Sequence, residues 1–278
     1  MGQWVQQKQA LQPEDIQAAT ENIKTCQDFI RDAGVDPKHV KAYGTESLRG
    51  LGKSGKHLAK QLGIHILTGK EEGALLYKGI LRNHPKVNAM IFEAGGGSTE
   101  WAFAKSKHNQ MFELGTTRSQ PANPFSQAGI AGMRKTIRKQ FKTVSTKQSQ
   151  KIRSSMGIKR LYITPSDNIR AFSQALYEKD ILKTPLTRAE LKGILKKANN
   201  REWVIQHSPP TSPQEVTERL PLRLSLLYET MRALKIKELA FGSAGGLKMA
   251  LLMDWADTIA KKEQQTKPAT TQHLTLLG

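Results

Sequence analysis

Apolar and polar positions repeat along the chain with two periods, which predict helices and strands in turn. The first helix is expected to begin at Pro13, because proline is tolerated in a first helical turn, and to end at Gly34. Apolar residues at helical spacing predict further helices over residues 54–62, 71–81, 130–144, 168–176, 187–197, 218–234 and 247–260. Short apolar runs predict strands over residues 40–43, 64–67, 87–94, 100–104, 161–164 and 236–241. This alternation predicts an α/β protein.

Length and composition narrow the class of protein. With 278 residues, the chain is long enough for one large or two medium domains. No run approaches the roughly 20 apolar residues of a membrane span, and no basic region followed by an apolar one opens the sequence. Cys26 is the single cysteine, which excludes an internal disulfide and a multi-cysteine zinc site. A cytoplasmic protein with a disordered polar tail over residues 263–278 is expected.

The charge points to a polyanionic partner. Lysine and arginine outnumber aspartate and glutamate by 43 to 24, so the formal net charge is +19. The surplus is concentrated, because no acidic residue lies between Glu113 and Asp167. A surplus of this size favours nucleic acid, polyphosphate, nucleotides or an acidic membrane surface. A solvated basic surface without a specific ligand is the alternative at this stage.

A glycine-rich turn between two apolar strands is the most informative segment. The turn and its flanks contain Glu93, Gly95, Gly96, Gly97, Ser98, Thr99 and Glu100. Glycines permit positive φ and a close approach of the backbone to a ligand, and successive N–H groups with nearby hydroxyls can bind an anion. The flanking carboxylates would repel a phosphate unless a divalent cation bridges them, so the combination predicts Mg²⁺. The alternative is a hairpin turn with incidental hydroxyls.

Three further segments are candidates for the same kind of site. Residues 68–73 run from a strand into a helix, where a carboxylate can orient water beside a phosphate or simply cap the helix. Arg49 can bind phosphate oxygens in a bidentate way, although a lone arginine is more often a surface residue. Residues 242–246 are expected to form a small-residue turn before a helix, which can bind an anion or serve only as a connection.

The order of these segments resembles the exopolyphosphatase and guanosine pentaphosphate phosphohydrolase (Ppx/GppA) family. That family carries Ala-Thr-Ser-Ala-Val-Arg, Ser-Gly-x-Glu-Glu-Ala and Asp-Ile-Gly-Gly-Gly-Ser-Thr-Glu, which residues 44–49, 68–73 and 93–100 match. Residues 112–118 are similar to the family's Ser-Leu-x-Leu-Gly-x-x-Arg strand and turn. The resemblance implies an actin-like fold (ribonuclease H-like, of the sugar kinase/Hsp70/actin superfamily). Its two domains are expected over residues 1–84 and 85–262.

The resemblance also implies a reaction and roles for individual residues. The reaction is Mg²⁺-dependent hydrolysis of terminal phosphoanhydride bonds in inorganic polyphosphate or guanosine pentaphosphate, in a cleft between the two domains. Glu72 matches the glutamate that activates the attacking water, and Glu100 matches an acidic residue of the catalytic metal site, to which Glu93 also belongs. Arg49 matches a phosphate-binding arginine, and residues 95–99 match the phosphate loop. Because the family often dimerises, a homodimer is expected.

Three departures from the family pattern bear on activity. The first strands of the N-terminal domain, with their Asp-x-Gly-Ser-Asn-Ser phosphate loop, are expected to be missing. Glu93 stands where the family has aspartate, which is one methylene shorter. Gly44 and Glu46 replace alanine and serine in the arginine motif.

These departures leave three functional hypotheses. The first is an exopolyphosphatase-like hydrolase, and the second is a catalytically impaired relative that binds polyphosphate or a guanosine alarmone. The third is a nucleic-acid-binding protein that uses residues 114–166. Because only Phe125, Phe141 and Tyr162 interrupt that basic stretch, without a pattern for base stacking, nucleic acid is the least favoured partner. The hydrolase is preferred, since Glu72, Glu100 and the glycine turn are all present.

Overall fold

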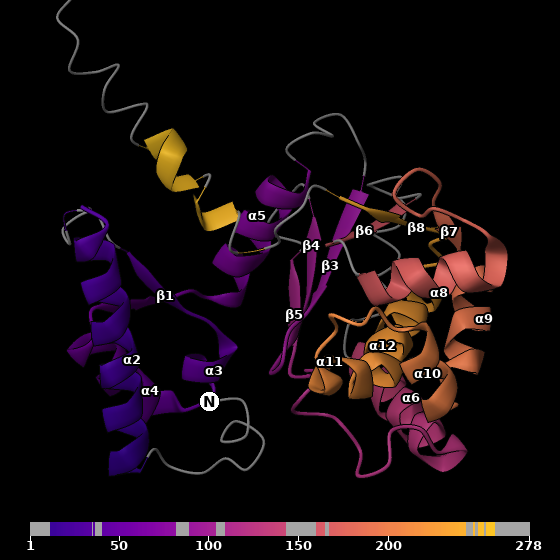
Figure 1. Ribbon diagram of the computed structural model, residues 1–278, viewed down its shortest axis with the longest axis horizontal. Coiled ribbons are helices and arrows are strands. Elements are labelled where there is room, and N and C mark those ends of the chain that lie inside the picture. Colours follow the sequence, from indigo (N-terminus) through magenta and orange to yellow (C-terminus); the bar gives the residue numbers. More distant parts are fainter. Residues whose placement is uncertain are drawn as a thin grey trace, which may run out of the picture.

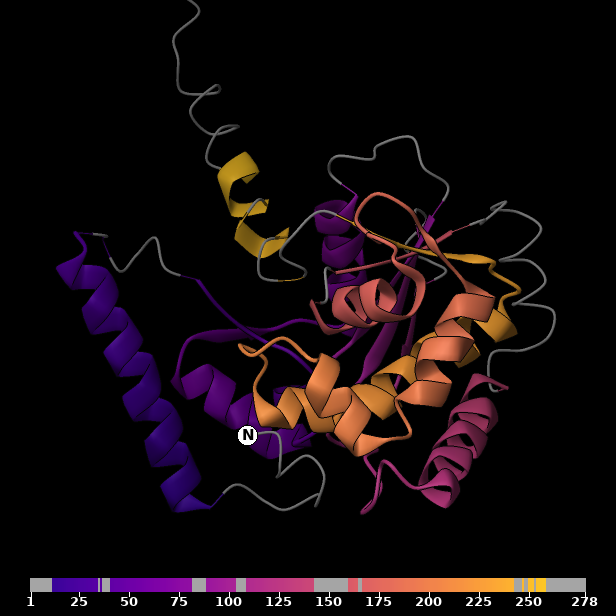
Figure 2. The ribbon, with the colours of Figure 1, turned by 45° about the vertical axis from the view of Figure 1, so that its right-hand side comes forward.

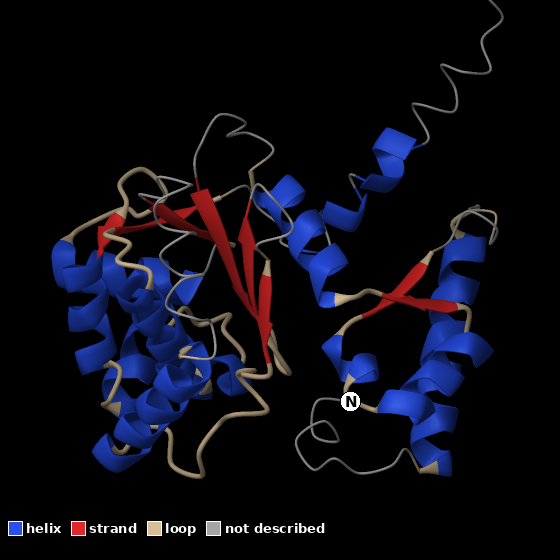
Figure 3. Cartoon of the chain, turned by 180° about the vertical axis from the view of Figure 1, so that it is seen from behind, coloured by secondary structure: helices blue, strands red, loops and turns tan. Residues whose placement is uncertain are grey.

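The computed structural model divides the chain into two parts, each with its own sheet (Figure 1). It describes residues 12–34, 36, 41–81, 89–103, 109–142, 160–164, 167–242, 247, 250–252 and 254–258. A two-stranded sheet belongs to the smaller part, and a six-stranded sheet with helices on both faces belongs to the larger one (Figure 3). The α/β class expected from the sequence is confirmed.

The smaller part is built around one parallel strand pair. Its elements are α2 (Pro13–Asp32), β1 (Ala42–Gly44), α3 (Glu46–Arg49), α4 (Gly52–Gln61) and β2 (Ile64–Ile66). Gly34 follows α2 with a φ of 78°, a left-handed conformation that suits glycine and ends the helix as expected. The chain crosses from β1 to β2 through α3 and α4, and a small core containing Leu48 and Leu58 lies beneath α2.

The larger part contains the remaining elements. They are α5 (Gly69–Ile80), β3 (Ala89–Ala94), β4 (Thr99–Phe103), β5 (Gln110–Phe112), α6 (Gln127–Phe141), β6 (Arg160–Ile163), α8 (Asp167–Tyr177), β7 (Leu186–Thr187), α9 (Arg188–Lys197), α10 (Arg201–His207), α11 (Gln214–Glu218), α12 (Leu220–Ala233) and β8 (Glu238–Phe241). The strand order is β5-β4-β3-β6-β8-β7. Strands β3, β6 and β8 are parallel, whereas β4, β5 and β7 pair in the antiparallel sense.

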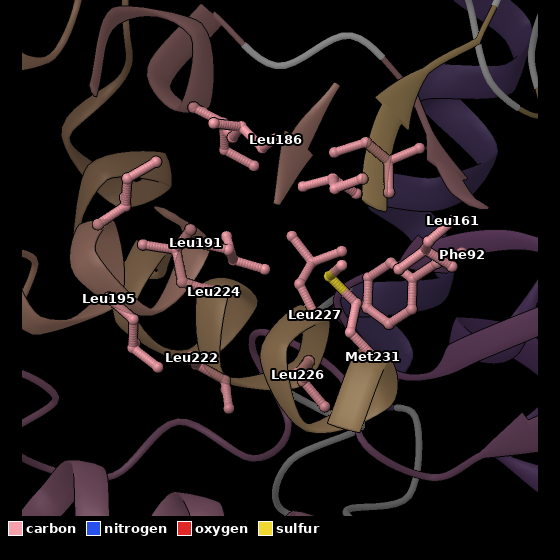
Figure 4. Packing of buried hydrophobic residues seen from close by; sticks show 14 of the residues in the cluster. Phe92, Leu161, Leu186, Leu191, Leu195, Leu222, Leu224, Leu226, Leu227 and Met231 are labelled. Carbon is pink, nitrogen blue, oxygen red and sulfur yellow. The ribbon is translucent and has the colours of Figure 1, made fainter. Parts of the chain in front are cut away.

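Both faces of the central strands are buried, which explains the continuous apolar run of β3. Met90 and Phe92 point to one face, where they join residues of α6, α9 and α12 in the main core. Figure 4 shows the α12 residues Leu227 and Met231 of this core beside Phe92. The opposite face packs against Leu76 and other residues of α5. Helix α5 therefore covers the larger sheet, although the predicted boundary at residue 84 assigns it to the first domain.

Most predicted elements occur within one to three residues of their expected positions. The helix expected over residues 218–234 is confirmed as α12, which begins with Pro221 in its first turn, where a missing N–H is tolerated. The sequence pattern does not predict the short elements α3, α10, α11, β5 and β7 as separate helices or strands. The tail over 263–278 and most of the 242–246 turn lie outside the described residues. No helix in the described part is both long and apolar enough to cross a membrane.

The fully buried position of Leu227 on α12 gives a test of the core. Leu227→Ala should lower the free energy of unfolding by about 2–5 kcal/mol, because it removes apolar contacts and leaves a cavity. Leu182→Ala is the matched control, since Leu182 is 51% exposed and its truncation should change stability by less than about 0.5 kcal/mol. Urea unfolding followed by circular dichroism measures both, and equal effects would contradict this assignment of the core.

Candidate active site

The glycine-rich turn between β3 and β4 packs against a second loop, residues 114–119. The N–H of Gly95 donates to the carbonyl of Ser98 at 2.9 Å, which closes the turn. The carbonyl of Gly95 accepts from the N–H of Thr116 at 2.8 Å. The carbonyl of Gly96 accepts from the N–H groups of Thr117 and Arg118, both at 2.9 Å. The second loop therefore uses the carbonyls of the turn, while the N–H groups of Gly96 and Gly97 find no acceptor among the described residues.

The glycines of the turn serve close approach rather than an unusual backbone conformation. In the described part of the chain, glycines with positive φ are Gly34, Gly52 and Gly63, so the expectation of positive φ in the turn is wrong. The tight contact comes from the other loop, because a Cβ on Gly115 would lie 2.0 Å from the carbonyl oxygen of Gly96. Gly96 itself is exposed, which leaves the turn accessible to a ligand.

Glu93 and Glu100 lie directly opposite each other on the hairpin that carries the turn. They are register partners of the antiparallel β3–β4 pair, so their side chains share one face of the sheet. Glu100 is buried and accepts a short hydrogen bond from the Ser98 hydroxyl, while Glu93 is partly buried and accepts from the Thr164 hydroxyl at 3.4 Å. The sheet register thus brings together the two carboxylates that the sequence places on either side of the turn.

Burial makes both carboxylates hard to ionise. Desolvation, with repulsion from Glu72 and Glu93, raises the pKa of Glu100 to about 8, although the Ser98 hydrogen bond and Arg49 oppose the shift. Desolvation also raises the pKa of Glu93, against the opposing charge of Arg223 and the hydrogen bond from Thr164. The charge of Glu72 contributes to the raised pKa of both Glu93 and Glu100, so the three carboxylates are near enough to interact electrostatically.

Glu71 and Glu72 at the start of α5 have separate tasks. Glu71 caps the helix, since its carboxylate accepts from the N–H of Thr68 at 2.7 Å and its own N–H donates to the Thr68 hydroxyl at 3.2 Å. Glu72 is buried instead and accepts from Nη1 of Arg49 at 2.9 Å. Burial raises the pKa of Glu72, and the Arg49 interactions oppose that shift. The helix-capping interpretation therefore applies to Glu71 and not to Glu72.

Arg49 is the centre of a chain of charges and is not a surface arginine. Its Nε donates to Glu46 at 3.2 Å, its Nη1 also donates to the carbonyl of Leu67, and its side chain is largely buried. The other oxygen of Glu46 accepts from Arg118 at 3.1 Å, and Arg118 also donates to Glu113 at 2.9 Å. Glu46 thus connects an arginine of the smaller part with an arginine of the larger part.

The sequence alone assigns no functional role to three residues near the candidate site, which are Glu46, Arg118 and Arg223. Glu46 stood out only as a departure from a family serine, and Arg118 only as the last residue of a resembling strand and turn. Arg223 on α12 carried no motif at all. Its charge acts on Glu93, and its Nε is buried without a partner among the described residues, so it has hydrogen-bonding capacity left for a ligand.

The carboxylates suit a cation that is shared with a substrate. Within the described residues, no three histidine, cysteine, aspartate or glutamate side chains are close enough to hold a metal ion by themselves. Mg²⁺ is commonly held by one or two carboxylates together with substrate phosphates and water, which the opposed pair Glu93 and Glu100 can provide. The donor set therefore fits Mg²⁺ held together with phosphate.

The two sheets, with a glycine-rich turn of one part close to the charged groups of the other, define an actin-like α/β protein. A family model described as the Ppx/GppA phosphatase family matches residues 1–259, and the chain belongs to this family. No curated protein gives a significant sequence match.

Three solved structures show the same fold. A Ppx/GppA family member from Aquifex aeolicus has a TM-score of 0.69 at 16% identity, covering 94% of this chain and 86% of its own. An exopolyphosphatase from Cytophaga hutchinsonii has a TM-score of 0.69 at 16% identity, covering 90% and 84%. An exopolyphosphatase-like protein has a TM-score of 0.70 at 13% identity, covering 93% and 89%. At these identities the likeness concerns the fold alone.

Gly115→Ala tests the packing of the two loops. The added methyl group would collide with the backbone of Gly96, so we expect a loss of about 1–3 kcal/mol in unfolding free energy. Gly132→Ala is the control, because nothing lies within 4 Å of its Cβ position on α6 and alanine favours a helix. Urea unfolding compares the two, and a Gly115→Ala protein as stable as the Gly132→Ala protein would contradict the close approach.

The raised pKa of Glu100 predicts a pH dependence of stability in the absence of divalent cations. Between about pH 4.5 and pH 8 the folded chain binds more protons at Glu100 than the unfolded chain, so stability falls as the pH rises through this window. Glu100→Gln should reduce that loss, because the amide never ionises. Glu215→Gln changes an exposed carboxylate and should follow the wild type. Urea unfolding in EDTA from pH 5 to pH 9 measures the slopes, and identical slopes would contradict the burial of an ionisable Glu100.

Proposed function

We propose that the protein hydrolyses terminal phosphoanhydride bonds of inorganic polyphosphate or guanosine pentaphosphate, with Mg²⁺. The observation that carries this proposal is the meeting of Arg49, Glu72 and the opposed pair Glu93 and Glu100 beside a glycine-rich turn. Membership of a phosphatase family supports the class of reaction. A likeness in fold to an exopolyphosphatase agrees with the substrate class.

The terminal phosphate would be bound by the turn and by arginine. The N–H groups of Gly96 and Gly97 are donors for its oxygens. Arg49 would exchange a carboxylate partner for phosphate oxygens, since its fork of N–H groups fits both. Arg223, whose charge acts on Glu93, offers an unused buried Nε. These groups can hold the phosphorus atom in place while its bridging oxygen leaves.

Glu93 and Glu100 would hold Mg²⁺, which neutralises charge on the phosphate oxygens. Ionising both carboxylates in the absence of a cation is unfavourable, as the raised pKa of Glu100 indicates. The Ser98 hydroxyl fixes the orientation of Glu100 through its hydrogen bond. The two carboxylates lie opposite each other, and a divalent cation between them would favour their ionised forms. Both observations support the proposed cation site.

Glu72 would orient the attacking water and accept its proton. Its buried carboxylate has a raised pKa, which brings its proton affinity closer to neutral pH and suits a general base. The water oxygen forms a bond to the terminal phosphorus as the bridging P–O bond breaks, and the shortened chain leaves with the bridging oxygen. Arg49 keeps Glu72 in position from the side of the smaller part.

A catalytically impaired relative that binds polyphosphate or a guanosine alarmone is the second candidate function. It is favoured by Glu46, which occupies both Arg49 and Arg118 and thereby competes with a phosphate for them. Glu46→Ser would restore the residue type of the family motif. Under this candidate the wild type binds polyphosphate without releasing phosphate, and Glu46→Ser binds more tightly.

The structure bears on the predicted nucleic-acid binding, but not on the predicted homodimer or location. Of the three aromatic residues in the basic stretch, Phe141 and Tyr162 are buried and Phe125 is partly buried against the core, so the stretch offers no series of exposed rings for base stacking. Nucleic acid therefore remains the least favoured partner. The expected homodimer and the cytoplasmic location stay predictions.

Glu72→Gln tests the proposed reaction. It should lower the rate of phosphate release from polyphosphate by on the order of 10²–10⁴-fold, because the amide cannot accept the proton of the water. Glu71→Gln is the matched control. The carboxylate of Glu71 lies next to Glu72 in the sequence, but it caps helix α5 and makes no hydrogen bond to a residue of the site. Phosphate release is measured with Mg²⁺ and again after EDTA, which should abolish it.

The outcomes separate the two candidate functions. Equal rates for Glu72→Gln and the wild type would refute the role of Glu72. Binding of polyphosphate without any release by the wild type would select the impaired relative. Release that persists in EDTA would contradict the role assigned to Glu93 and Glu100.

A further inference from the structure

A second arginine cluster lies where α6 and α12 pack together on one face of the six-stranded sheet (Figure 2). The fully buried carboxylate of Glu229 accepts from Nε of Arg134 at 2.7 Å and from Nε of Arg232 at 2.6 Å. It also accepts from Nε and Nη2 of Arg138 at 3.0 and 2.9 Å. One buried carboxylate thus orients three guanidinium groups.

The cluster contains more positive charge than the buried carboxylate requires. Three guanidinium groups around one carboxylate leave a net charge of +2, and Glu229 is the one acidic partner of these arginines among the described residues. The arginine side chains are 26%, 43% and 49% exposed for Arg134, Arg138 and Arg232, so their remaining N–H groups reach solvent. Like charges held this closely repel one another unless an anion joins them.

Arg134 also connects the cluster to a cavity of about 400 Å³ between α6 and α9. The guanidinium of Arg134 lies 5.0 Å from the ring centre of Tyr228, which further fixes its position. Lys192 and Lys196 line the cavity and are exposed one helical turn apart on α9. The cavity therefore has cationic walls.

We propose that this surface, formed by Arg134, Arg138, Arg232, Lys192 and Lys196, binds the distal part of a linear polyphosphate chain. This inference rests on the proposed function and selects polyphosphate within it, because guanosine pentaphosphate has too few phosphates to occupy the active site and a second cationic surface. Helix α12 carries both Arg223, whose charge acts on Glu93, and Arg232, about 14 Å further along its axis. Nine residues place the two side chains on opposite sides of the helix, so a ligand that reaches both places must pass around α12, as a long phosphate chain can.

Polyphosphate fits the surface better than nucleic acid does. Single-stranded nucleic acid is commonly bound through bases stacked on exposed aromatic rings. Tyr228 is the aromatic residue beside the arginine cluster, and Arg134 lies over its ring. A chain of phosphates needs only closely spaced cations, which α6 supplies without a single acidic residue.

The test compares two pairs of exposed lysines with the same helical spacing. Lys192→Gln with Lys196→Gln alters the proposed surface, whereas Lys56→Gln with Lys60→Gln on α4 is the control. Both double variants are made in the Glu72→Gln background, so that polyphosphate is not consumed. Affinity for long-chain polyphosphate is measured at several salt concentrations. Loss of two phosphate contacts should reduce the slope of log K against log salt by about two, and affinity by about tenfold or more.

The control pair should bind like its parent. Equal salt slopes for the two double variants would overturn the surface, and so would an RNA of matched charge that binds the parent more tightly than polyphosphate. Arg232→Gln offers a second check, because it removes one exposed guanidinium while two remain on Glu229, and it should also weaken binding. If the wild type binds polyphosphate through these lysines but releases no phosphate, the surface stands and the proposed hydrolysis fails.

Discussion

The site depends on a buried chain of opposite charges, in which Glu72, Arg49, Glu46 and Arg118 alternate. A carboxylate taken out of water is unfavourable unless a cation replaces its hydration, and removal of one partner leaves the other charge buried and uncompensated. Arg49 of the smaller part pairs with Glu46 of the same part and with Glu72 of α5, and Glu46 also pairs with Arg118 of the larger part. Ion pairs thus join the two parts, which have separate apolar clusters. Glu72 and the hairpin, in contrast, are held together by the apolar packing of α5 on β3 and β4.

The larger sheet supplies the rigid side of this arrangement. Because helices cover both faces of β3 and β4, the register of the hairpin is fixed by which side chains fit each core. That register places Glu93 opposite Glu100 and brings the turn against the loop that contains Gly115. The apolar packing of the sheet thus determines how close two carboxylates stand, and burial then makes their ionisation depend on a cation.

The sequence predicts the parts of this structure that depend on local pattern. Periodicity locates the main helices and strands, but the four-residue α3 and the two-residue β7 are too short to show a period. Motif order identifies Arg49 and Glu72, whereas the Glu46–Arg118 pair joins positions 72 residues apart and depends on how the two parts meet. Three consecutive glycines suggest positive φ in the turn, but none of them has it. The turn is constrained instead by the close approach of Gly115 from another loop, which no local sequence pattern reveals.

Acidic side chains outnumber arginines in one arginine cluster, and arginines outnumber acidic side chains in the other. The basic composition of the chain therefore does not describe the candidate active site. Around the candidate active site, the carboxylates of Glu46, Glu72, Glu93, Glu100 and Glu113 outnumber the guanidinium groups of Arg49, Arg118 and Arg223. The net charge of +19 therefore does not arise at the site where a phosphate would react. A polyanion approaching this carboxylate-rich site needs a cation there, and the charge that attracts it must lie elsewhere on the surface. On α6 and α9 the cationic side chains outnumber the acidic ones, and the proposed surface there would bind a phosphate chain whose end lies at Glu72.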